Sequence, residues 1–278
     1  MEYLYHYTSL DTLALILHNR TICFNNLLYV DDSEEAETDD MGKFGRFVYV
    51  SCWTDDHEES IPLWNMYTPN MHGVRIRMPK FPFRKFKYRK GELFLSEDIE
   101  TRIDMKKLYD ENKISIASTE PHFVKIEYTE EYDKLYPKIR TESCLGALKV
   151  ILGECTLDDI GVDNAEVNYD FKHLGIYKRT NWSFQKEYRY IITSMPIGMQ
   201  ELGCLSFEKK QELYKRIEDR DLEPPYKRLF LELSDEAFLG MEVVFGPRMS
   251  DAEKIMAKSL LNQYCPHADY RESSLRIK

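Results

Sequence analysis

Long apolar stretches are missing from this sequence of 278 residues. A membrane-spanning helix needs about 20 consecutive apolar residues, and no segment approaches that length. The first residues, Met1 to Tyr5, have neither the basic region nor the apolar region of a secretory signal peptide. The hydrophobic share of 43% and the charged share of 31% are those of an ordinary globular protein. We therefore expect a folded, cytoplasmic protein with no membrane contact.

Cysteine pairs with the spacing of a metal or redox motif are also absent. The six cysteines are far apart in the sequence, and no two of them form a CxxC motif. Without a secretion signal, the reducing cytosol keeps such thiols free. We expect six unpaired thiols, at Cys23, Cys52, Cys144, Cys155, Cys204 and Cys265.

Positive charge is in the minority, with 38 Lys and Arg residues against 48 Asp and Glu residues and a net charge of -10. Such a protein repels phosphate backbones over most of its surface, so the overall charge does not favour nonspecific nucleic-acid binding. The basic and aromatic stretch Lys80 to Lys90 is an exception, because charge and stacking together can grip a nucleic acid. We favour the alternative that this stretch is an exposed edge strand protected by its Lys and Arg residues.

The standard catalytic motifs are missing as well. The sequence contains no P-loop, GxGxxG, HExxH, GxSxG or EF-hand loop. The acidic cluster Asp31 to Glu35 has the carboxylates that a divalent metal prefers, but it lacks a His and a defined ligand spacing. We interpret it as a solvated charged loop and expect no metal cofactor; a metal-dependent nuclease is the disfavoured alternative.

Short strands interspersed with helices predict an α+β fold rather than a doubly wound sheet. Helices are expected where capping residues precede apolar residues with helical spacing, at 9–17, 60–66, 98–111, 142–152 and 251–262. Strands are expected in β-branched and aromatic runs, at 3–8, 21–24, 46–53, 73–78, 122–128, 188–193, 228–233 and 241–245. The polar stretch 25–45 reads as a long loop. No repeat or linker divides the chain, so we interpret 1–278 as one domain with inserted helices and loops.

Three short segments carry residues that are suited to chemistry. Tyr5 to Thr8 places His6 in a strand that turns at once into a helix, and Tyr49 to Trp53 places Ser51 in a second strand. Gln185-Lys186-Glu187 comes just before a third strand. Each segment alone also has an ordinary structural explanation: a histidine with one structural hydrogen bond, a core strand, and solvated charges at a strand entry.

Taken together, His6, Ser51 and Glu187 resemble the three-part signature of the ADP-ribosyltransferase superfamily, and Gln185-Lys186-Glu187 matches its Q/E-x-E element. The chain as a whole resembles bacterial domain-of-unknown-function family 2971, which usually has ExE where this chain has Gln185-x-Glu187. The matching segments extend from end to end: YHYTSLDTLALIL at 5–17, VYVSCW at 48–53, SIPLWNMY at 60–67, GVRI at 73–76, WSFQKEYR at 182–189, VVFGPRMS at 243–250 and the tail ESSLRIK.

This resemblance implies both a fold and an activity. The fold would be an ADP-ribosyltransferase-like core, a split mixed or antiparallel β-sheet with flanking helices. The activity would be NAD-dependent mono-ADP-ribosyl transfer, with NAD as the substrate and no metal. The acceptor would be a macromolecule, a protein rather than a nucleic acid, and the protein would act as a toxin or phage-defence effector. For this signature to work, the three strands must meet around one cleft that both His6 and Glu187 face.

Each residue then has an expected role. Cleavage of the nicotinamide glycosidic bond builds positive charge on the ribose, and the carboxylate of Glu187 would stabilise that charge as it develops. Gln185, two residues away on an extended segment, would point the same way and orient the acceptor. On the cofactor side, NAD contacts are expected from His6 and Thr8, from Ser51 at the carboxamide, from Trp53, Trp64 or Tyr67 by stacking, and from Arg189 at the diphosphate.

Three alternatives remain open at this point. Arg189 could pair with Glu187 instead of NAD, because strand periodicity puts both on one face. The enzyme could be an NAD glycohydrolase, with water as the acceptor. The chain could also be a catalytically silent module that binds a nucleotide or a partner, which the glutamine at position 185 favours.

Overall fold

The structure is a computed structural model that describes residues 2–111, 114–143, 166–196 and 226–277, together with 209, 212, 215, 216, 219 and 222–224. Cysteine pairing can be followed for Cys23, Cys52 and Cys265, which are free thiols. The other three cysteines lie outside the described residues. Within the described part of the chain, no helix is both long enough and apolar enough to cross a membrane.

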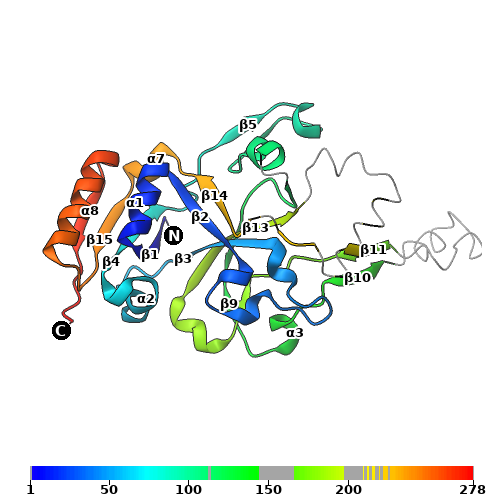
Figure 1. Cartoon of the computed structure of the whole chain (residues 1–278), viewed down its shortest axis with the longest axis horizontal. Helices are drawn as coiled ribbons and strands as arrows, with labels where there is room; N and C mark the ends of the chain where they lie inside the picture. The colour runs from blue at the N-terminus through cyan, green and yellow to red at the C-terminus, as the bar shows by residue number, and fades with distance from the viewer. Residues whose placement is uncertain are drawn as a thin grey trace, which may run out of the picture.

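The fold is mixed, with a large β-sheet and several helices, as the sequence predicts (Figure 1). Its main path is formed by seven strands in the order β14 (Arg228–Glu232), β2 (Thr21–Asn26), β3 (Val48–Thr54), β1 (Tyr3–Ser9), β4 (Gly73–Pro79), β15 (Glu242–Phe245) and β16 (Asp269–Glu272). The neighbours are antiparallel except for β15 and β16, which are parallel, so the sheet is mixed.

A branch leaves this path at β3. The long strand β13 (Glu187–Met195) pairs antiparallel with the whole of β3, and its other edge pairs with β8 (His122–Lys125) and β7 (Ser115–Ile116). The remaining edge of β3 is divided between two strands. Its first half pairs with β2, at Tyr49 and Val50, whereas its last residue, Thr54, pairs with Tyr5 of β1. Because β1 and β2 diverge from the same edge, the sheet splits there.

Local sequence signals explain the helices around this sheet. Helix α1 (Leu10–Asn19) begins where the side chain of Ser9 accepts a hydrogen bond from the backbone N–H of Thr12. Helix α2 (Ile61–Tyr67) has the equivalent cap at Ser60 and a proline in its first turn. Helix α8 (Asp251–Tyr264) opens on the predicted capping box and packs beside α1 (Figure 1). The smaller helices are α3 (Tyr132–Leu135) and α7 (Asp235–Leu239).

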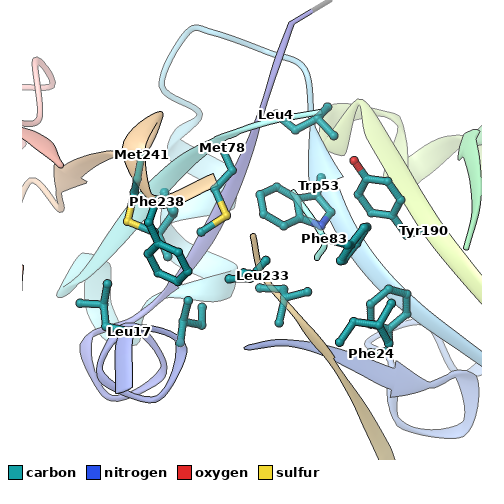
Figure 2. Packing of buried hydrophobic residues seen from close by; sticks show 14 of the residues in the cluster. Leu4, Leu17, Phe24, Trp53, Met78, Phe83, Tyr190, Leu233, Phe238 and Met241 are labelled. Carbon is teal, nitrogen blue, oxygen red and sulfur yellow. The ribbon is translucent and has the colours of Figure 1, made fainter. Parts of the chain in front are cut away.

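The largest core cluster among the described residues joins strands of the main sheet, β13 included, to helices α1, α7 and α8. Trp53 of β3 and Tyr190 of β13 meet edge to face, and Phe83 packs against Tyr190 with ring centroids 4.8 Å apart (Figure 2). Buried aromatic pairs of this kind contribute about 0.5–1.5 kcal/mol beyond the area that they bury. The core therefore fixes β3 against β13 and makes the ends of these strands a rigid base for a site.

Short elements complete the description. They are the 3₁₀ helices η1 (Leu27–Tyr29), η2 (Ser33–Ala36), η3 (Phe44–Phe47), η4 (Pro69–Met71), η5 (Glu92–Phe94) and η8 (Thr180–Gln185), and the π-helix η6 (Lys107–Glu111). Three two-stranded sheets join β5 (Phe86–Tyr88) to β6 (Ile99–Thr101), β9 (Glu127–Tyr128) to β12 (Tyr177–Lys178), and β10 (Arg140–Ser143) to β11 (Glu166–Tyr169).

Two predicted helices are wrong where they can be followed. The stretch 98–111 begins as β6, and only its end is helical; the hydroxyl of Thr101 accepts from the N–H of Ile103, a local bond that competes with helix formation. The stretch 142–152 begins inside strand β10, and its residues 144–152 lie outside the described part of the chain. The predicted loop 25–45 contains η1, η2 and the start of η3, because Asn26 and Asp32 cap the first two turns.

Candidate active site

A small cavity lies at the point where the sheet splits. Its volume is about 60 Å³, which is room for a few water molecules. Strand β1, the end of β3, helix α2 and the entry to β13 all contribute to its wall. The lining residues are Tyr5, His6, Tyr7, Cys52, Trp53, Thr54, Leu63, Tyr67, Gln185 and Glu187. The expectation that three distant strands meet around one cavity faced by both His6 and Glu187 is thus confirmed.

His6 is held in one orientation on the β3 side of this cavity. Its Nδ1 lies 2.9 Å from the backbone oxygen of Cys52, so Nδ1 carries the proton and Nε2 is left as an acceptor. The imidazole also packs against Trp53, with ring centroids 5.1 Å apart. Burial lowers the pKa of His6, despite the opposing effect of the hydrogen bond to Cys52. The histidine is therefore a neutral hydrogen-bonding group at physiological pH.

Glu187 is the carboxylate of the cavity, and two cations hold it. The Nε of Arg189 donates to Oε1 of Glu187 at 2.6 Å, and Nη2 donates to Oε2 at 3.2 Å. The Nζ of Lys178 donates to the same Oε2 at 3.0 Å. These contacts match the second of the two roles considered for Arg189, which is to pair with Glu187.

Glu35, which lies far from these residues in the sequence, completes this cluster. It forms ion pairs with Arg189 and with Lys178, whose Nζ lies 3.2 Å from Oε1. All four side chains are buried, with at most 6% of each exposed. We call Glu35, Lys178, Glu187 and Arg189 the buried charge cluster. Its two carboxylates and two cations balance, so the cluster carries no net charge.

The charges in the cluster fix its protonation states. Burial alone would raise the pKa of Glu187, but the charges of Arg189 and Lys178 outweigh burial and hold that pKa well below its usual range. Burial and Arg189 act to lower the pKa of Lys178, and the two carboxylates reverse this and raise it. Glu187 is therefore an ionised carboxylate throughout the neutral pH range, which a charge-stabilising role requires.

Gln185 joins the cavity to the cluster. Its Oε1 accepts from Lys178 at 2.8 Å, and its Nε2 donates to the hydroxyl of Tyr67 at 2.6 Å. Gln185 and Glu187 do point toward the same place, but strand periodicity is not the reason. Gln185 ends helix η8, and Lys186 adopts a left-handed conformation with φ of 45°, which turns the chain into β13.

Ser51 is not brought into the cavity wall. Its hydroxyl accepts from the indole N–H of Trp53 at 3.0 Å and is buried in the core. In the β3–β13 pairing, Ser51 lies opposite Tyr190, and Glu187 lies opposite Thr54. Tyr190 is an odd number of positions from Glu187 along β13. Directly paired residues share a face and consecutive residues alternate, so Ser51 and Glu187 are on opposite faces of the sheet.

Two other expected NAD contacts also lie behind the wall. Trp64 is fully buried, packs edge to face on Tyr7, and donates its indole N–H to Glu59 at 3.2 Å. Thr8 is buried where β1 pairs with β4. Of the expected stacking residues, the structure brings Trp53 and Tyr67 to the cavity and places Trp64 one layer further in.

The sequence interpretation missed three members of the site. Glu35 belongs to the acidic cluster that we expected to be solvated, yet it is buried in the interior, and its neighbour Glu34 pairs with Arg179. Charge density at Asp31 to Glu35 indicates solvent exposure, so nothing local distinguishes Glu35. Lys178 has no motif around it, although it lies only seven residues before Gln185. Cys52 was interpreted only as a free thiol.

Comparison with protein-family models, with curated proteins and with solved structures found no match for this chain. The resemblance to family 2971 and to the ADP-ribosyltransferases stays a prediction based on the motifs.

Proposed function

We propose that this cavity binds the nicotinamide end of NAD and that the protein transfers ADP-ribose to a macromolecular acceptor. The observation that carries the proposal is the placement of an ionised Glu187 in a cavity whose other lining side chains are uncharged, more than half of them aromatic or histidine. A carboxylate in such surroundings acts most strongly on a positive charge, because water screens it little. A ribosyl cation is such a charge.

The chemistry follows from the charge that develops at the ribose. The bond between C1′ and the nicotinamide nitrogen breaks, and nicotinamide leaves with the electron pair. The ribose then carries an oxocarbenium-like charge that Glu187 stabilises, until a nucleophile of the acceptor bonds to C1′ and releases its proton. Trp53 and Tyr67 offer ring faces to nicotinamide, and Nε2 of His6 accepts a hydrogen bond from a ribose hydroxyl.

Binding requires the cavity to open. A volume of about 60 Å³ is too small for a nicotinamide riboside unit, so a wall residue has to move. Tyr67 stands at the end of helix α2 and is attached to the cluster through Gln185. Its displacement would widen the cavity and free Nε2 of Gln185 to hold the acceptor.

One observation favours a second function, that of a nucleotide-binding module without catalysis. Both carboxylate oxygens of Glu187 are already held by Arg189 and Lys178, as in a purely structural ion pair. Glu35 pairs with the same two cations, Arg189 and Lys178. Their positive charge is therefore divided between two carboxylates and does not act on Glu187 alone. Whether Glu187 retains enough negative charge to accelerate glycosidic cleavage separates the two functions.

The test is the release of nicotinamide from NAD, measured with and without cell lysate, together with label transfer to macromolecules. Glu187→Gln keeps the shape of the side chain and should lower the rate about 100-fold or more, roughly 3 kcal/mol, with little change in NAD affinity. Glu131→Gln is the matched control, because it removes an exposed carboxylate outside the cavity. Circular dichroism should confirm that both variants are folded.

Two further variants separate the proposed roles. His6→Ala should weaken NAD binding, and Gln185→Ala should reduce transfer to the acceptor more than nicotinamide release. Full activity of Glu187→Gln would refute the catalytic assignment. A wild-type protein that binds NAD but never consumes it would establish the binding module.

A further inference from the structure

The basic stretch at Lys80 to Lys90 does not fold as one edge strand. Only Phe86–Tyr88 pairs as a strand, with β6. Residues 80–85 run instead along the end of β14, where the N–H of Arg84 donates to the backbone oxygen of Glu232 and Phe83 forms a bridge with Leu233. The expected edge strand is therefore confirmed for three residues, and the rest of the stretch needs another explanation.

These residues border a broad cleft of about 1010 Å³, at the upper end of the volumes that small ligands occupy. Basic side chains reach the cleft from separate parts of the sequence, including Arg20 after α1, Lys80 after β4, and Arg102 and Lys107 after β6. A second hollow of about 190 Å³ shares Lys107 and Glu232 with it and adds Arg228 and Phe230 of β14. We call the two together the basic groove.

Charge and aromaticity in this groove contrast with the rest of the molecule. Seven Lys and Arg residues line it against four Asp and Glu residues, in a chain whose net charge is -10. Phe230 leaves 52% of its surface exposed between these cations. The ring of Phe81 is half-buried beside Lys80 and Arg102, and its backbone φ of 60° is unusual for a residue with a bulky side chain.

The ion pairs at the groove do not prevent an anion from binding. Arg84 pairs with Glu232 and Arg102 with Glu120, but these side chains are 27–61% exposed. Exposed pairs contribute only about 0–1 kcal/mol, so a phosphate can replace a carboxylate at small expense. Lys80 and Lys107 form no ion pair with any described residue, and they are available without such an exchange.

We propose that the basic groove binds single-stranded nucleic acid. Phosphates would be held by Lys80, Lys107 and Arg228, and bases would stack on Phe230 and Phe81. Two neighbouring hollows that share Lys107 and Glu232 suit a linear strand of several nucleotides better than a single nucleotide. This proposal differs from the expectation drawn from the overall charge, because net charge averages over the surface, whereas binding depends on local charge.

The test is independent of NAD chemistry. Fluorescence anisotropy with a labelled 12-nucleotide oligo(U) and its DNA counterpart should give saturable binding to the wild-type chain. Lys80→Ala combined with Lys107→Ala should weaken binding and reduce the slope of log K against log salt by roughly 1.4, at about 0.7 per phosphate contact. Lys138→Ala combined with Lys172→Ala removes the same charge from exposed positions outside the groove and should change neither quantity.

The aromatic part of the proposal has its own variant. Phe230→Ala should weaken binding roughly 5-fold or more, since each stacked base contributes on that scale. Leu239→Ala, which removes an exposed apolar side chain outside the groove, is its control. Equal affinities of the groove and control variants would overturn the proposal, as would undetectable binding at low salt. Stronger competition by UMP than by unlabelled oligo(U) would identify a mononucleotide site instead, and stronger competition by polyglutamate would identify a site for acidic peptides.

Discussion

Ion pairs in this chain occur in two different surroundings, the buried charge cluster and the rim of the basic groove. The N–O distances are similar: 3.0 Å between Lys178 and Glu187 in the cluster, and 2.8 Å between Arg84 and Glu232 at the rim. Exposure differs greatly. The two cluster side chains are 3% and 6% exposed, whereas those of the rim pair are 61% and 33% exposed.

Burial decides what each set of charges can do. In the cluster, the loss of hydration is so large that every charge depends on its partners, and removing one leaves another without compensation. At the rim, water solvates the charges almost as well as their partners do. A buried cluster can thus keep a carboxylate ionised and fixed for chemistry, whereas an exposed pair can exchange its partner for a ligand. The predictions below test this difference, from the largest effect to the smallest.

The largest effect is expected from Arg189→Met. This change leaves Glu35 and Glu187 with Lys178 as the one remaining cation of the cluster, so about 3–5 kcal/mol of unfolding free energy should be lost. Urea denaturation followed by circular dichroism measures it. Arg84→Met is the matched control at the rim and should lose less than about 1 kcal/mol. Similar losses in both variants would refute the distinction between the two regions.

A pH dependence should also trace to the cluster. The folded-state pKa of Glu187 lies below its ordinary value of 4.5, so its ionisation stabilises the fold fully above about pH 4.5. That contribution is lost as the pH falls through the lowered pKa. The difference in unfolding free energy between wild type and Glu187→Gln should thus be constant from pH 5 to 7 and shrink below pH 4.5.

Other carboxylates titrate in the same range, so the difference between two proteins is the informative quantity. Glu131→Gln, which removes an exposed carboxylate, should show a small difference that changes little over this interval. A wild-type advantage over Glu187→Gln that stayed constant down to pH 2 would mean that Glu187 is not held as an ionised group.

Local signals in the sequence were enough for most strands and caps. Strand β1 with the Ser9 cap, strand β3 and the capping box of α8 were all predicted within a few residues, because each depends on neighbours in sequence. The helix expected at 98–111 failed because its first part pairs with β5, and pairing with a distant segment overrides local propensity.

The site was predictable only in part for the same reason. His6 and Glu187 were found through motifs, but the ion pair between Glu35 and Arg189 joins residues 154 positions apart. Glu35 is surrounded in the sequence by other acidic residues, a pattern that predicts solvent exposure. The motif of Ser51 was assigned to the correct strand, β3. Side chains alternate along a strand, however, and that of Ser51 is on the core face, opposite to Glu187. The basic groove is likewise formed by segments that are far apart in the sequence, and no local pattern predicts that they lie together.

The smallest effect is expected from a double-mutant cycle on the rim pair, Arg84→Ala with Glu232→Ala. Both side chains are largely solvated, so their coupling energy should be below about 1 kcal/mol at 0.1 M salt and vanish at 1 M, where the screening length is about 3 Å. The comparison cycle, Lys178→Met with Glu35→Gln, joins two buried groups that the salt does not reach. Its coupling should exceed that of the rim pair and stay within error at both salt concentrations. If salt weakened both couplings alike, the cluster would be hydrated in solution, and Glu187 would lack the dry surroundings that its proposed role in NAD cleavage needs.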